Sequence, residues 1–491
     1  MKNIIILCFA TLLVLSKQDQ EASKESVQYY QSLLQYFLKN SSKWEKPKDS
    51  RKFFKLKNEE DEAVNHGHYH FIIVGAGVAG SVLAHRLTES GKFQALLLEA
   101  GGPENDFTDV PGFAPYLARS DFNWGYKTIP QNNSCLGFKN KQCNYHRGRA
   151  IRGTSVINFL IYVRGNKEDF YEWGKDNPGW DYENVLPYFK KSENSTLDLE
   201  DPGYHGKDGP LSVEYVKYQP EVLKIFLEAA KQRGQNILDY NGQNQNGYST
   251  FQSMTRNGKR CSVKILIRNI TAFGIEFIRE GKKYRVTASK EVIISGGTIN
   301  SPQLLLLSGI GPKEHLVELG IPVIKDLPVG KIFHDYHVYI GLLFSTNMST
   351  KSEPPLEEHI KNDLKGRGLL TAAITITGGG FENPKIPHGL PSVEYGIFSG
   401  LIEEITKENW EALTKALSGK YIYDVVPSLL HPKSKGTVKL KTKDPLDFPV
   451  LESNIFTDEN RDDMKEMLTF IKYIFKISKT PVFQSIDSRY K

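Results

Sequence analysis

The chain has 491 residues, of which 39% are hydrophobic and 24% charged, a composition typical of a globular protein with more than one domain. Its 63 basic and 57 acidic residues leave a net charge of +6, too small an excess to indicate nucleic acid or an anionic membrane as a partner. The four cysteines lack the paired spacing of a structural zinc site, so we predict no metal.

The N-terminus reads MKNIIILCFATLLVLSKQ, in which Lys2 precedes an apolar run from Ile4 to Leu15. The run is too short to cross a bilayer and is typical of a signal peptide, which we assign to residues 1–17. Residues 18–67 are interpreted as a lead helix, with apolar residues at helical spacing in ESVQYYQSLLQYFLKN, and a charged linker. The mature protein is therefore predicted to be secreted and extracellular.

Cysteines and glycosylation motifs agree with an oxidising compartment. Cys135 and Cys143 bracket LGFKNKQ, a short loop that a disulfide could close. Cys261 would stay unpaired, and its simplest interpretation is a small buried hydrophobe. Asn-x-Ser/Thr motifs, which can carry glycans in a secreted protein, begin at Asn40, Asn132, Asn194, Asn269 and Asn347.

A strand–turn–helix pattern begins at residue 68, where a G-x-G-x-x-G fingerprint follows a short apolar strand. Gly75 permits a tight turn, Gly77 lets the backbone approach a diphosphate, and Gly80 lets helix and strand pack closely. Glu99 ends the next strand, where a carboxylate accepts hydrogen bonds from ribose hydroxyls and disfavours NADP. The alternative is that the glycines serve only a tight turn, and the fingerprint does not separate NAD from FAD. The predicted dinucleotide contacts are Gly75, Gly77, Val78, Ala79, Gly80 and Glu99.

Three separated motifs resemble those of the glucose–methanol–choline (GMC) oxidoreductases. FIIVGAGVAGSVLAHRLTES followed by LLLEAGG resembles the opening of that family. RGRAIRGTSVINFLIYVRGN (147–166) resembles its first signature loop, and GGTINSPQLLLLSGIGP (296–312) its second. The similarity runs from about residue 68 to the end. The cysteine-bracketed insert and the signal peptide resemble the insect glucose-dehydrogenase-like branch.

The resemblance implies an α/β fold: a Rossmann-like FAD-binding domain with an inserted α+β substrate domain built on an antiparallel sheet. The FAD-binding domain would span residues 68–340 discontinuously, with a cap segment at about 165–215. The substrate domain would span residues 341–460. Residues 461–491 would form a C-terminal helix that returns toward the FAD-binding domain.

The resemblance also implies the chemistry. FAD would lie on the glycine fingerprint, beneath a loop from Gly148 to Ile161. An alcohol or sugar would give its hydroxyl proton to a base and a hydride to flavin N5, and the electrons would pass to a quinone or to oxygen. The matching contact positions in the loop are Gly153, Thr154, Asn158, Phe159, Leu160 and Ile161.

Three departures from the family pattern bear on activity. Arg152 replaces a signature glycine, which would cost about 1–2 kcal/mol at a positive φ, although its guanidinium could pair with a flavin phosphate. After GKRCS only VKILIRNITAF precedes Gly274, so an equivalent of the family's adenine-side strand is missing. The family's catalytic His would lie beyond Lys491, so we assign no catalytic residue.

Two groups of histidines could substitute for the expected base: His334 with His337, and His66 with His68 and His70. Ordinary surface or core histidines are the favoured interpretation of both. We therefore predict a relative of the FAD-dependent oxidoreductases whose own turnover is absent. The alternatives are a non-catalytic flavin-binding or interaction protein, an incomplete chain of an ordinary GMC enzyme, and an NAD-dependent dehydrogenase.

Overall fold

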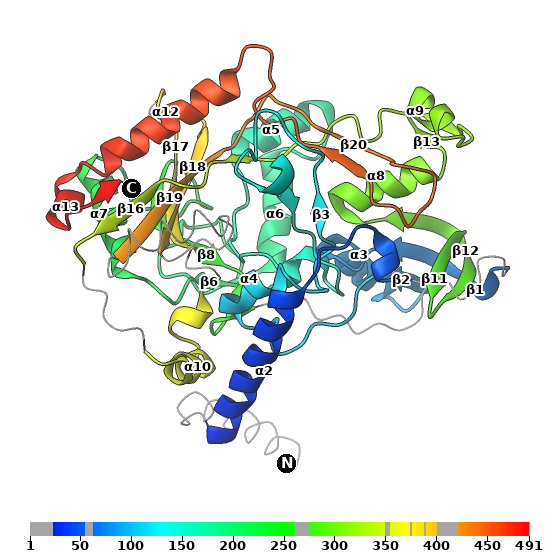
Figure 1. Ribbon diagram of the computed structural model, residues 1–491, viewed down its shortest axis with the longest axis horizontal. Coiled ribbons are helices and arrows are strands. Elements are labelled where there is room, and N and C mark those ends of the chain that lie inside the picture. Colours follow the sequence, from blue (N-terminus) through cyan, green and yellow to red (C-terminus); the bar gives the residue numbers. More distant parts are fainter. Residues whose placement is uncertain are drawn as a thin grey trace.

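The structure is a computed structural model. The two largest β-sheets of the described residues lie at opposite ends of the molecule, with helices and loops between them (Figure 1). No helix in the described part of the chain is long and apolar enough to cross a membrane. The predicted signal peptide, Cys261 and Asn269 lie outside the described residues. The structure describes residues 23–54, 62–260, 274–348, 354–373, 376–386, 389–399 and 421–490.

The sheet at the right of Figure 1 has four strands in the order β11-β12-β1-β2. β1 (Val64–Val74) pairs in parallel with β12 (Lys282–Ile294) and with β2 (Ala95–Leu98). β11 (Ile275–Arg279) pairs antiparallel with β12. α3 (Val78–Thr88) follows β1 directly and contacts both β1 and β2. Because parallel strands linked through a helix are the unit of doubly wound folds, the Rossmann-like prediction is confirmed for this part of the chain.

The N-terminal prediction is right for the helix and partly wrong for the linker. The lead helix is α2 (Lys24–Lys43), and its Leu34 is buried. The linker does not extend to residue 67, because β1 already begins at Val64 by pairing with β12. The stretch after α2 is also docked, since Arg51 forms an ion pair with Asp447 (2.9 Å).

The sheet at the left of Figure 1 has seven strands in the order β22-β16-β19-β18-β17-β7, with β15 beside β19. Every pairing in it is antiparallel, as the resemblance implied. Its strands are β7 (Gly247–Thr250), β15 (His337–Val338), β16 (Leu343–Thr346), β17 (Ile376–Glu382), β18 (Val393–Ser399), β19 (Tyr421–Leu429) and β22 (Arg489–Tyr490).

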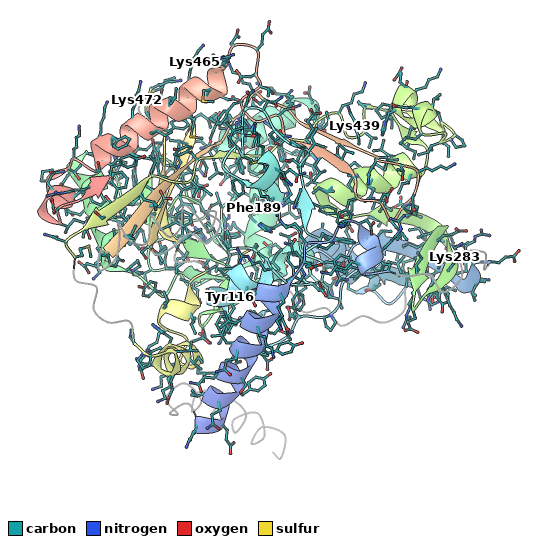
Figure 2. All side chains as sticks on the ribbon, in the orientation of Figure 1. Tyr116, Phe189, Lys283, Lys439, Lys465 and Lys472 are labelled. Carbon is teal, nitrogen blue, oxygen red and sulfur yellow. A yellow bond between two sulfur atoms is a disulfide. The ribbon has the colours of Figure 1, made fainter. Side chains whose placement is uncertain are left out.

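One face of this sheet carries the largest core of the molecule. α7 (Glu221–Gln232) and α12 (Asp462–Ile477) contribute Phe226 and Phe470, which are fully buried together with Tyr395 of β18. The outer side of α12 is polar, and Lys465 and Lys472 point away from the molecule (Figure 2). The helix is therefore amphipathic and buries its apolar side on the seven-stranded sheet.

Two of the predicted domain boundaries are wrong. The sheet takes β7, β15 and β22 from outside residues 341–460, while β20 and β21 inside that range pair with each other instead. Residues 461–491 do not return toward the FAD-binding domain. α12 packs on β19, because its buried residues Met467, Ile474 and Ile477 belong to the core of the seven-stranded sheet, and β22 joins that sheet beside β16.

The predicted disulfide between Cys135 and Cys143 is present, with Cα atoms 5.4 Å apart.

Shorter elements connect the two sheets. The other α-helices of the described residues are α4 (Ala114–Leu117), α5 (Lys167–Asp176), α6 (Tyr182–Ser192), α8 (Gly297–Leu307), α9 (Lys313–Glu318), α10 (Leu356–Leu364) and α13 (Pro481–Ser485). The remaining strands are β3 (Tyr126–Lys127), β4 (Asn144–Tyr145), β5 (Glu193–Ser195), β6 (Leu211–Tyr215), β8 (Gln252–Ser253), β9 (Thr255–Arg256), β10 (Lys259–Arg260), β13 (Ile310–Gly311), β14 (Lys325–Asp326), β20 (Thr437–Lys439) and β21 (Val450–Glu452).

Candidate cofactor site

The glycine fingerprint forms a tight turn between β1 and α3. Gly75 has a φ of +102°, and a Cβ there would lie 2.5 Å from the carbonyl oxygen of Ser295. A Cβ on Gly80 would lie 2.0 Å from the carbonyl oxygen of Gly75 and 3.1 Å from Cγ2 of Ile73. Both positions therefore require glycine, the first for the turn and the second for close packing of helix against strand.

Gly77 differs from its neighbours because it faces open space. A Cβ at Gly77 would have no atom within 4 Å. Gly77 caps the N-terminus of α3, and Val78 and Ala79 after it are exposed. The first N–H groups of an α-helix have no partner within the helix and form its positive end. The turn therefore offers an accessible backbone cradle for a diphosphate, and the contacts at these three residues stay predictions.

Glu99 follows β2 and organises the same turn. Its Oε2 accepts a hydrogen bond from the N–H of Ala76 (2.8 Å), and its Oε1 accepts one from the N–H of Gly101 (2.9 Å). Burial raises the pKa of Glu99 above its usual value, and these two backbone donors oppose the rise. A carboxylate has about four acceptor sites, and three backbone N–H groups, those of Ala76, Ala100 and Gly101, bond to Glu99, so the predicted ribose contact is compatible with this geometry.

The predicted flavin-covering loop closes over the turn. Arg152 has a φ of +83°, in the left-handed region that favours glycine, and its N–H donates to the carbonyl of Ala76 (2.6 Å). A Cβ on Gly153 would lie 3.0 Å from the Cα of Gly77. The guanidinium of Arg152 is buried and pairs with Glu104. Its charge is therefore neutralised by a carboxylate of this chain, a partner that the sequence did not indicate.

The other predicted contact residues of the loop differ in how far their side chains are exposed to a ligand. Thr154 and Phe159 are exposed, and Asn158 is half-buried. Leu160 has a φ of +66° and is buried, so its side chain packs inside the protein and only its backbone can approach a ligand. Ile161 packs with a cluster that includes residues of β17. The loop therefore lies between the glycine turn on one side and the seven-stranded sheet on the other.

Sequence reasoning missed Arg260, which holds this loop in place. Arg260 lies in β10 and is buried, and its Nη1 donates to the carbonyl of Ser155 (2.8 Å) and to Oδ1 of Asn158 (2.7 Å). Burial lowers the pKa of the Arg260 guanidinium to about 10, which leaves it charged at neutral pH. Asn158 and Arg260 are 102 positions apart, so no local pattern could have paired them.

The histidines weighed as substitutes for a base have other contacts. His68 and His70 each form a hydrogen bond beside the four-stranded sheet. Nε2 of His334 lies 2.7 Å from a backbone carbonyl oxygen. His337 is buried beside the ring of Phe456, and burial lowers its pKa. Within the described ranges, no group of three or more His, Cys, Asp or Glu side chains could hold a metal ion.

A separate cavity of about 670 Å³ lies at the start of α5. Its walls include residues 165–168, 240–246 and 389–391, and none of the predicted cofactor residues lines it. The candidate cofactor site is therefore the glycine turn with its covering loop, and this cavity is a different feature of the surface.

A turn of close-packed glycines at a helix N-terminus, a loop closed over it and a second, antiparallel sheet are typical of a dinucleotide-dependent oxidoreductase. The chain belongs to the GMC oxidoreductase family, whose pattern matches residues 69–266 and 260–338. The two matched ranges share residues 260–266. The predicted family is therefore confirmed, and the predicted loss of a strand after Cys261 stays a prediction.

Relatives and solved structures agree with this assignment. Glucose dehydrogenase [FAD, quinone] from Drosophila pseudoobscura pseudoobscura is 33% identical over 500 residues, covering 94% of this chain and 77% of that protein. Ecdysone oxidase from Bombyx mori is 31% identical over 472 residues, covering 87% and 69%. A formate oxidase variant from Aspergillus oryzae RIB40, studied for FAD modification, has a TM-score of 0.72 at 22% identity, covering 87% and 84%. The predicted oxidoreductase class and its FAD cofactor are confirmed at the level of the family.

Proposed function

We propose that this chain binds FAD and is a GMC oxidoreductase directed at CH–OH donors, which are alcohols or sugars. The supporting observation is the close approach of the covering loop to the glycine turn. A Cβ on Gly153 would lie 3.0 Å from the Cα of Gly77, while Gly77 itself faces open space. Backbone N–H groups can therefore approach a diphosphate at the N-terminus of α3 without obstruction by side chains.

The residues of the site would have distinct tasks. FAD supplies the hydride chemistry, and the protein binds, orients and excludes water. The first turn of α3 would hold the diphosphate, and Glu99 would meet the ribose. Asn158 and Phe159 would lie beside the ring system. The face of the seven-stranded sheet that Ile161 contacts, which includes Phe381, would form the opposite wall of the substrate space.

We further propose that these 491 residues alone do not turn over alcohols or sugars. Every histidine that the structure describes is already in contact with another residue. His205, for example, lies 3.0 Å from Glu193 and 2.8 Å from Asp239. A general base has to reach the substrate hydroxyl, and neither the glycine turn (75–80) nor the covering loop (148–161) contains a histidine. The absence of a histidine from these two segments supports flavin binding without catalysis.

The experiment separates binding from turnover. The purified chain is examined for the absorbance of bound oxidised flavin, and dye reduction is then assayed with a panel of alcohols and sugars, under air and with a quinone. We expect flavin absorbance without dye reduction. Turnover would refute the proposed inactivity, and a protein that takes up NAD instead of FAD would support the NAD-dependent alternative. A protein that takes up neither would favour a purely structural or interaction role.

We also propose that the protein is secreted. The disulfide between Cys135 and Cys143 and the exposed glycan acceptors Asn40, Asn132 and Asn347 support an oxidising compartment. Expression in a eukaryotic secretory host should place the protein in the medium, with a mass that falls on glycosidase treatment. Retention inside the cell without glycans would contradict the proposal.

A further inference from the structure

Arg260 is a buried cation whose hydrogen-bond acceptors are all neutral. It is 5% exposed, and its Nε donates to the carbonyl of Thr108 (2.9 Å). Nη1 donates to the carbonyls of Ser155 (2.8 Å) and Asn158 (3.0 Å) and to Oδ1 of Asn158 (2.7 Å), and Nη2 donates to the same Asn158 carbonyl (3.0 Å). No carboxylate within the described residues forms an ion pair with it. Four of the five side-chain hydrogen bonds that Arg260 forms with described residues therefore fix the position of one loop.

These contacts determine which way the Asn158 amide points. A guanidinium carries donors and no acceptor, so the amide must turn its oxygen toward Arg260. Nδ2 of Asn158 then points away from Arg260, and its two hydrogens have no acceptor among the residues described. The backbone of Asn158 is held as well, because its N–H donates to the carbonyl of Thr154 (3.0 Å). The half-buried side chain thus presents a donor that is fixed in orientation and has no partner in the part of the chain that the structure describes.

We propose that Arg260 is a positioning residue that makes Asn158 a hydrogen-bond donor toward the flavin ring system. This inference rests on the proposed FAD site and adds which kind of ligand edge that site would select. The loop would select a ligand edge that carries an acceptor, such as a ring nitrogen or carbonyl oxygen, and would disfavour an edge that carries a donor. The buried charge of Arg260 works in the same direction, because a cation nearby favours an electron-rich edge.

Two substitutions at these positions and one control test the inference in the full-length chain. Asn158→Asp keeps an oxygen facing Arg260 and replaces the outward N–H donor with a second acceptor, at nearly constant volume. Arg260→Met removes the donors that orient Asn158, and Arg260→Lys retains the charge with fewer donors. Arg256→Met is the matched control, because Arg256 lies in the same hairpin and is exposed. FAD affinity is measured by fluorescence titration, and apoprotein stability by thermal unfolding.

We expect Asn158→Asp to keep the thermal midpoint of the apoprotein and to weaken FAD binding about tenfold or more. Arg260→Met should weaken it at least as much, Arg260→Lys should recover part of the loss, and Arg256→Met should change neither quantity. The absorbance bands of flavin bound to Asn158→Asp should also shift relative to the unsubstituted protein. Unchanged affinity in Asn158→Asp would overturn the inference while leaving the proposed FAD site intact. An unsubstituted chain that fails to bind FAD would overturn both.

Discussion

The two large sheets differ in how far the side chains around them are buried. On α3, which packs on the four-stranded sheet, Val78 is 57% exposed and Val82 is 44% exposed. In the core of the seven-stranded sheet, Phe344 and Phe470 are almost completely buried. In the first region, close approach of glycine backbones determines the geometry, as at Gly80. In the second region, large side chains fill a continuous core. The difference teaches that the candidate cofactor site depends on where side chains are absent, while stability depends on where they are packed.

The largest effect is expected in the core of the seven-stranded sheet. Phe470→Ala should lower the free energy of unfolding by about 3–5 kcal/mol, because it removes a fully buried aromatic ring and leaves a cavity. Urea unfolding followed by circular dichroism measures this change. Leu468→Ala on the same helix is the control: Leu468 is 47% exposed, so its loss should stay below about 0.5 kcal/mol. Equal losses in both variants would contradict the assignment of the buried face of α12.

The second prediction sharpens the contrast at the glycine turn. Gly80→Ala should cost about 3 kcal/mol, because the new Cβ would meet the backbone carbonyl of Gly75 at 2.0 Å, and backbone cannot move aside as a side chain can. Gly77→Ala has open space at its Cβ and should leave stability nearly unchanged while weakening FAD binding. Thermal unfolding and flavin titration of both variants provide the check. Weakened stability in Gly77→Ala with normal flavin affinity would reverse the roles assigned here.

The third prediction concerns a buried ionic cluster in the region between the two sheets. Burial disfavours the charged ring of His205, but its hydrogen bonds to Asp239 and Glu193 raise its pKa to about 9. Arg164 also pairs with Glu193. Because the pKa of His205 is higher in the folded state than in the unfolded state, its contribution is fully present below pH 6.5. That contribution, about 2–3 kcal/mol, is lost as the pH rises through 9.

Thermal midpoints measured from pH 6 to pH 10 test this sign. The unsubstituted chain should lose stability steadily between pH 6.5 and pH 9, and His205→Gln should show a flatter profile over the same interval. His85→Gln is a suitable control, because His85 is exposed on α3 and lies 3.8 Å from Glu89. A slope that survives in His205→Gln would assign the pH dependence to other groups.

Local steric requirements were predictable from the sequence, and long-range partners were not. The fingerprint predicted Gly75 and Gly80 because each glycine answers a clash within one strand–turn–helix unit. The predicted helix within residues 461–491 is present as α12, but its sequence does not say which surface receives its apolar side. Arg260 was missed because its acceptors lie 102 or more positions away. Glu104 was missed for a related reason, since it meets Arg152 only when the covering loop folds back.

The smallest effect is expected at Arg152, where the backbone conformation favours glycine and the ion pair of the side chain favours arginine. The φ of +83° favours glycine by about 1 kcal/mol, whereas the guanidinium neutralises Glu104. Arg152→Gly and Arg152→Ala both lose the ion pair, but only glycine relieves the backbone. Arg152→Gly should therefore be more stable than Arg152→Ala by about 1 kcal/mol in urea unfolding.

Combining each substitution with Glu104→Gln separates the backbone preference from the ion pair. Removing the unpaired carboxylate should restore some stability to both single variants by a similar amount, because that penalty is common to them. The difference between glycine and alanine should persist, since it arises from the backbone alone. If the difference vanishes in the double variants, the backbone at residue 152 is not strained. Arginine at this position would then not lower the stability of the fold, despite its positive φ.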